Sequence, residues 1–248
     1  MGLTKSTNPV LSEDIFEKQV EKASGYGQMT VKGAATKTLL LLLMTTVTAS
    51  ITWKLFNVEN TMVFPLMIGG AIGAFIFALI TSFKPEKSAI FGSLYAICEG
   101  LALGAVSAAY NYETYGLVFQ AVLLTFVVTA IMAFCYRMGI LQATAKFTKV
   151  LFFATAAVGV FYLLSIVLSF FNIELSVFRL GLLGIVIQFV IVAVAALNLI
   201  LDFDVIESGV REGAPEYMEW YGAFSLMVTL VWLYLEILRL LSILNRRN

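Results

Sequence analysis

Acidic side chains interrupt three long apolar stretches of this chain. Glu99 lies midway along one stretch, Asp202 and Asp204 close another, and the last stretch contains Glu236. An ionised carboxylate at the centre of a bilayer costs on the order of 2.5 kcal/mol or more. Such side chains are expected to face a partner, water or a translocated ion. They are therefore the first candidates for ligands of a cation or for sensors of protons.

The apolar stretches that position these acids have the length of membrane spans. The 248 residues are 60% hydrophobic and 13% charged, whereas soluble domains are about 45–50% apolar and about 25% charged. A helix crosses a bilayer with about 20 apolar residues. Backbone N–H and C=O groups without a hydrogen-bond partner are not tolerated in lipid, so the spans must be helices. We therefore predict an all-α integral membrane protein with seven transmembrane helices, at residues 36–56, 62–82, 89–111, 115–136, 149–171, 180–201 and 222–243.

The chain divides into a polar N-terminal arm, residues 1–35, and a transmembrane domain, residues 36–248. Within the arm, residues 10–22 fit either a short surface helix or a disordered tail. More of the Lys and Arg residues near the helix ends lie on the inner side if the N-terminus is cytoplasmic, and this excess favours that orientation.

The spacing of the acids suggests which of them face the interior. Glu99 has only apolar or small neighbours, so it is predicted to point into the bundle, either for function or as a neutral acid that bonds another helix. Residues two apart on a helix project about 200° apart, so only one of Asp202 and Asp204 can face the bundle. The deeper Asp202 is predicted to do so. Alternatively, both are solvated acids at a helix end.

The remaining acids favour simpler interpretations. Glu236 lies three residues before Arg239, so the two are predicted to pair on one helix face, far from Asp202. The predicted loop between the last two helices carries further acids, most of them expected to be solvated while they concentrate cations locally. These are Glu207, Glu212, Glu216 and Glu219.

Small residues at helical spacing predict close helix contacts. Gly69 and Gly73 form one small-xxx-small pair, and Gly100 and Gly104 form another. Such pairs let helix backbones approach each other in a membrane.

The composition argues against enzymes and nucleic-acid binding. The chain has no histidine, which removes Ser-His and Cys-His catalysis and His-bound metals, and it has no Gly-x-Ser-x-Gly motif. An aspartyl protease needs two facing aspartates, and only one predicted helix supplies any. The net charge is zero, which gives no case for nucleic acid as a partner. We predict no enzyme and no bound cofactor.

Four sets of residues together resemble a known family. They are Asn8-Pro9 with residues 29–38, Glu99-Gly100-Leu101 with Gly104, residues 198–207, and residues 218–224 with 232–239. In this order they resemble the Bax-inhibitor-like (transmembrane Bax-inhibitor-motif) membrane proteins, especially the bacterial branch. The resemblance implies seven helices, with the last one central and surrounded by the other six, and a bacterial inner membrane location.

The resemblance also implies a function. Some members are pH-sensitive calcium leaks, in which two aspartates on helices six and seven hydrogen-bond and act as a proton switch. Others control cell death or bind a membrane quality-control protease. The first aspartate falls on Asp202, or on Asp204 if the gap is placed differently, and the second falls on Thr229, which cannot titrate.

Two functions follow as hypotheses. The first is a pH-sensitive cation leak, with Asp202 as the sensor and candidate calcium ligand, Glu99 as its buried partner, and calcium or protons as the transported ions. The alternative is a non-transporting regulator that binds another membrane protein, such as a protease. Glu236, Thr229 and Arg239 are weaker site candidates.

Overall fold

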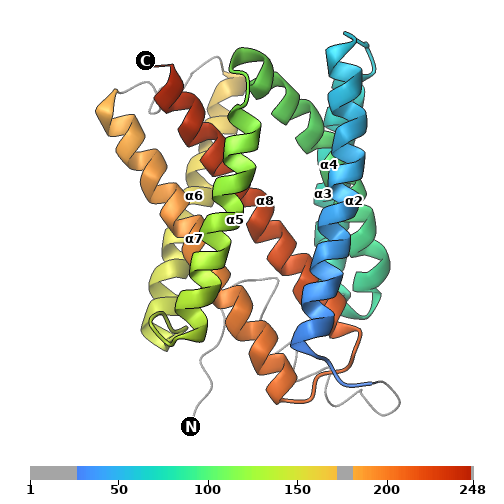
Figure 1. Cartoon of the computed structure of the whole chain (residues 1–248), viewed down its shortest axis with the longest axis vertical. Coiled ribbons are helices and arrows are strands. Elements are labelled where there is room, and N and C mark those ends of the chain that lie inside the picture. Colours follow the sequence, from blue (N-terminus) through green and yellow to red (C-terminus); the bar gives the residue numbers. More distant parts are fainter. Residues whose placement is uncertain (1–26, 172–180, 247–248) are drawn as a thin grey trace.

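The protein is a bundle of long helices (Figure 1). The structure, a computed structural model, describes residues 27–171 and 181–246, so the predicted surface helix at 10–22 lies outside the described residues. All seven predicted spans are present, and each is long and apolar enough to cross a membrane. They are α2 (Val31–Asn57), α3 (Val63–Phe83), α4 (Ser88–Glu113), α5 (Leu117–Arg137), α6 (Ala145–Phe170), α7 (Leu182–Arg211) and α8 (Met218–Asn245).

The ends of two helices differ from the prediction. α7 continues to Arg211 and α8 already begins at Met218, so the predicted loop at 202–221 is wrong. The last turns of α7 are less apolar than its centre, but one face of them, which includes Val205 and Ile206, is buried. This burial extends the helix beyond the apolar stretch. Asp202 therefore lies inside a helix rather than at its end.

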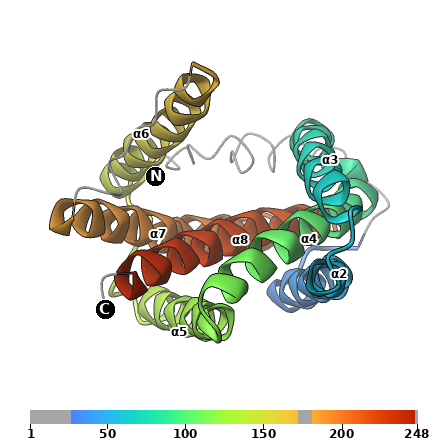
Figure 2. The same cartoon turned by 90° about the horizontal axis from the view of Figure 1, so that it is seen from above.

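The last helix lies at the centre of the bundle. α8 packs against α2, α4, α5 and α7 (Figure 2). α3 packs mainly on α4, and α6 packs mainly on α7, so these two are the outer helices. The predicted central position of α8 is confirmed, while its main neighbours are four of the six other helices.

Glycines set the close approach of α2, α3 and α4. A Cβ atom at Gly100 or Gly104 would overlap with α2, and one at Gly70 or Gly73 would collide with α4 near Cys98. Open space surrounds Gly69. The predicted pair at 100 and 104 is thus a true helix contact, whereas Gly70 rather than its predicted neighbour joins Gly73 on the contact face.

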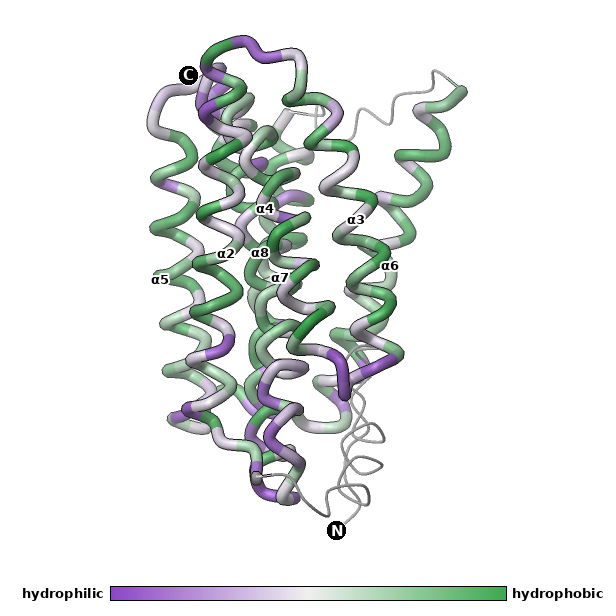
Figure 3. Tube along the Cα trace, turned by 90° about the vertical axis from the view of Figure 1, so that its right-hand side faces the viewer, coloured by the Kyte–Doolittle hydropathy of each residue, from purple (hydrophilic) through white to green (hydrophobic). Residues whose placement is uncertain are grey.

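Short extended segments close one end of the bundle, which we call the arm end. Residues 27–30 run beside the α7–α8 loop, where Gln28 forms an isolated antiparallel bridge with Pro215. The Met29 amide donates to the Ala214 carbonyl at 2.7 Å. Hydrophilic residues gather mainly at this end and at the opposite, far end, with hydrophobic residues between them (Figure 3).

Candidate functional site

Asp202 lies at the interface between α7 and α8 near the arm end. Its side chain is wholly buried, as the spacing predicts for the inward residue of the pair. Ser225 Oγ on α8 donates to Asp202 Oδ1 at 3.2 Å. Thr229 also interacts with this carboxylate. Because Ser225 and Thr229 are four residues apart, both hydroxyls project from one face of α8.

The Asp202 carboxylate is only partly compensated by its surroundings. Its Oδ2 atom has no hydrogen-bond partner, and neither oxygen has a Lys or Arg partner, among the residues that the structure describes. A buried ionised group is costly unless it is paired and hydrogen-bonded. Asp202 can therefore carry a proton or attract a cation, and one titratable group faces two hydroxyls here.

Asp204 points away from Asp202, toward α5. It lines a cavity of about 800 Å³ at the arm end, which we call the vestibule, between the ends of α2, α5 and α7. The Tyr136 hydroxyl lies 2.6 Å from Glu207 Oε2 and 3.2 Å from Asp204 Oδ1. One hydroxyl proton can be donated fully to only one of these carboxylates. The vestibule therefore holds two carboxylates that share one hydroxyl proton, and Arg137 also lines it.

Two residues that line the vestibule are sequence neighbours of Asp202 and Ser225. Phe203 on α7 and Leu226 on α8 also line it, and they directly follow Asp202 and Ser225.

Glu99 does not join this site. It is partly buried on α4, where its electrostatic neighbours are Tyr95 and Cys98. In the described residues, 27–171 and 181–246, no hydrogen bond or ion pair joins Glu99 to Asp202. The predicted partnership of the two acids is therefore not seen.

Glu236 is the centre of a second buried cluster, toward the far end. The predicted pair with Arg239 is present, at 3.2 Å between Nη1 and Oε2. Donors from three helices complete it: Tyr162 of α6 bonds both carboxylate oxygens at 2.8 and 2.9 Å, Gln188 of α7 donates at 2.8 Å, and Trp232 of α8 donates at 3.0 Å. Sequence reasoning missed these partners, although Gln188 within an apolar span is a detectable signal.

Glu219 is an exception to the prediction that most of the loop acids are solvated, since Glu207 and Glu216 are exposed. It lies in the first turn of α8 and is only 4% exposed. Its carboxylate accepts hydrogen bonds from the Thr30 amide and hydroxyl, both at 2.8 Å, and from Lys37 Nζ at 2.5 Å. Gly33 lies so close that an added Cβ would overlap with the carboxylate. Three of the sequence positions that carry the family resemblance thus meet one acid.

These features define a class of protein. It is a seven-helix membrane protein with its last helix at the centre and with carboxylates buried along that helix. The family of Bax inhibitor 1 like proteins matches residues 8–246, and the chain belongs to this family. No curated protein and no solved structure matches the chain.

Proposed function

We propose that this protein is a pH-regulated cation leak of a bacterial inner membrane, and that it conducts ions rather than catalysing a reaction. The observation that carries the proposal is the position of Asp202, which is wholly buried between α7 and α8 and precedes Phe203, a residue that lines the vestibule. The arm end faces the cytoplasm in this proposal, in line with the excess of basic residues there.

The vestibule supplies the entrance for cations. Asp204 and Glu207 place two carboxylates on one side of it. Carboxylates that line a cleft raise the local concentration of cations. Oxygen ligands of this kind suit calcium, which makes Ca²⁺ the ion to test first.

The pathway is closed in the arrangement that the structure describes. Beyond Asp202 toward the far end, α7 and α8 meet through buried apolar side chains, including Leu199, Leu230 and Leu233. Ions could pass only if α7 and α8 shifted relative to each other. A change in the charge of Asp202 would alter its bond with Ser225 at this same interface, so protonation is coupled to the gate.

A single carboxylate serves as the sensor in this proposal. Thr229 occupies the position of a second aspartate and faces Asp202 with a hydroxyl. A hydroxyl can support either protonation state, because it both donates and accepts. The pH response is then expected to follow one group instead of a coupled pair.

The test is calcium flux into dye-loaded liposomes at about pH 6 and pH 8. The wild-type protein should give a flux that differs between the two values, and Asp202→Asn should remove the difference. Glu113→Gln is the matched control, because Glu113 is an exposed far-end acid paired with Arg246. An unchanged pH profile for Asp202→Asn would refute the sensor role.

No flux above empty liposomes at either pH would refute the leak itself. That result would favour the alternative function, a regulator that binds another membrane protein. Capture of membrane partners by crosslinking in cells would then be the next experiment.

A further inference from the structure

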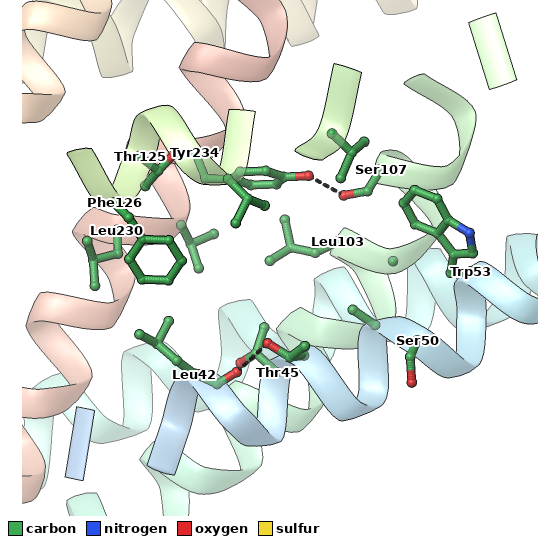
Figure 4. Close-up of a pocket in the computed structure, with 16 residues that line it drawn as sticks. Leu42, Thr45, Ser50, Trp53, Leu103, Ser107, Thr125, Phe126, Leu230 and Tyr234 are labelled. Carbon is green, nitrogen blue, oxygen red and sulfur yellow. Dashed lines mark hydrogen bonds between the residues drawn. The ribbon is translucent and has the colours of Figure 1, made fainter. Parts of the chain in front are cut away.

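A second cavity lies on the side of α8 that is opposite to α6 (Figure 2). It has a volume of about 390 Å³ and lies among α2, α4, α5 and α8 (Figure 4). Ligand pockets have volumes of about 300–1,000 Å³. Leu103 of α4 and Leu230 of α8 form its floor, each 8% exposed, whereas Phe126 of α5 is 57% exposed at its edge. The cavity thus has a buried floor and an exposed rim.

The walls of this cavity offer few free hydrogen-bonding groups to water. Ser107 and Tyr234 bond each other at 2.7 Å (Figure 4). Thr46, Ser50 and Thr125 donate to carbonyl groups of their own helices at 2.7–2.8 Å. A water molecule needs two to four polar partners, and apolar cavities stay dry or take apolar molecules. The cavity is therefore suited to hydrocarbon.

The cavity has the length of one half of a bilayer. Its α2 wall runs from Leu42 to Trp53, a rise of about 16 Å at 1.5 Å per residue. The hydrocarbon core of a bilayer is about 30 Å thick, so half of it is about 15 Å. Trp53 stands at the far-end limit beside the exposed Lys54, where interfacial Trp and Lys residues are common.

The rim is continuous with the lipid-facing surface of the bundle. On α2, Leu43 and Val47 beside the cavity are exposed, and on α5, Phe119 and Leu123 are exposed. In a transmembrane bundle these side chains contact lipid. The medium that meets the rim is therefore the bilayer.

We propose that this cavity binds one acyl chain of a bilayer phospholipid, inserted between α2 and α5 from the leaflet at the far end. The chain lies against Leu103 and Leu230, and the headgroup stays at the level of Trp53. This site is separate from Asp202 and the vestibule, and it goes beyond the proposed ion leak.

The test uses the full-length protein in phosphatidylethanolamine–phosphatidylglycerol vesicles that contain a phospholipid with a photoreactive diazirine midway along one acyl chain. Irradiation and peptide mass spectrometry should place label on Leu103 and Leu230, which surface lipid does not reach. Label confined to exposed positions such as Leu43 and Phe119 would overturn the proposal.

A pair of variants separates the cavity from the general lipid surface. Thr46→Trp with Val122→Trp adds two large rings at the rim, where both native residues are exposed, and should abolish label at Leu103 and Leu230. Leu163→Trp, at a position of α6 that is 63% exposed, should leave that label intact. Wild-type labelling of the floor in the filled variant would refute the site. So would a protein–protein crosslink showing that a second copy covers α2 and α5.

Discussion

The ammonium group of Lys37 on α2 lies 2.5 Å from a carboxylate oxygen of Glu219 on α8, across 182 positions of sequence. The same carboxylate accepts hydrogen bonds from the amide and the hydroxyl of Thr30, the residue that caps α2. Both charged side chains are largely buried, with exposed fractions of 15% and 6%. One acid therefore fixes the start of the first membrane helix against the start of the last.

Replacing Glu219 should destabilise the bundle more than replacing its neighbour does. Glu219→Gln removes the charge that faces Lys37, and loss of one partner of a buried ion pair costs about 3–5 kcal/mol. Glu216→Gln is the control, because Glu216 lies 3.8 Å from Lys37 but is 60% exposed, and exposed pairs contribute about 0–1 kcal/mol. Thermal unfolding of the purified proteins measures both. Equal melting temperatures for the two variants would contradict the anchoring role.

A methyl group at Gly104 should disturb the contact between α4 and α2. Its Cβ would overlap with the Ala49 carbonyl oxygen and the Thr52 hydroxyl. Overpacking of this kind costs about 1–3 kcal/mol. Gly69→Ala should be neutral or slightly stabilising, since nothing lies within 4 Å of its Cβ position and Ala favours a helix by about 1 kcal/mol over Gly. Similar melting temperatures for Gly104→Ala and Gly69→Ala would count against this packing.

Loss of the Tyr162 hydroxyl should loosen α6 selectively. This hydroxyl bonds both oxygens of Glu236 and also bonds Arg239, and it ties the outer helix α6 to the central α8. A hydrogen bond to a charged group contributes about 1.5–3 kcal/mol. Hydrogen exchange should therefore speed up in α6 of Tyr162→Phe while α8 stays protected. Ser165→Ala is the control, because among the described residues the Ser165 hydroxyl bonds only the Phe161 carbonyl of its own helix.

A second carboxylate at position 229 should make stability depend on pH. Thr229→Asp places an acid beside Asp202, and two carboxylates that share a site cannot both ionise without cost. Repulsion is present when both are ionised and vanishes when one is protonated, so this variant should lose stability as the pH rises from about 6 to 8. Thr229→Asn is the uncharged control. Equal pH profiles of melting temperature for the two variants would show that position 229 does not face Asp202 closely enough.

Hydropathy alone predicted the seven spans, because the cost of exposed backbone in lipid leaves only long helices. It misplaced the ends of α7 and α8, because these turns leave the apolar stretch yet stay buried by packing. Helical spacing indicated that only one of Asp202 and Asp204 faces the bundle, and the greater depth of Asp202 correctly selected it as the inward acid.

The partners of the acids were harder to predict than their positions. Glu219 pairs with residues more than 180 positions away, and no local pattern carries that information. The bonds of Glu236 to Tyr162 and Gln188 likewise depend on which helices become neighbours. The pairing with Arg239 was predictable because it is made within one helix turn.

The link between Lys37 and Glu219 also has a consequence for the order of synthesis. The ribosome makes α2 before α8, yet the acid that neutralises Lys37 and bonds Thr30 is made only with α8. During translation α2 therefore lies in the membrane without this ion pair until α8 is made. Truncated chains that end before Met218 should keep the contact of α2 with α4 but leave the start of α2 without its link to α8, so that the last helix acts as the closing step of biogenesis.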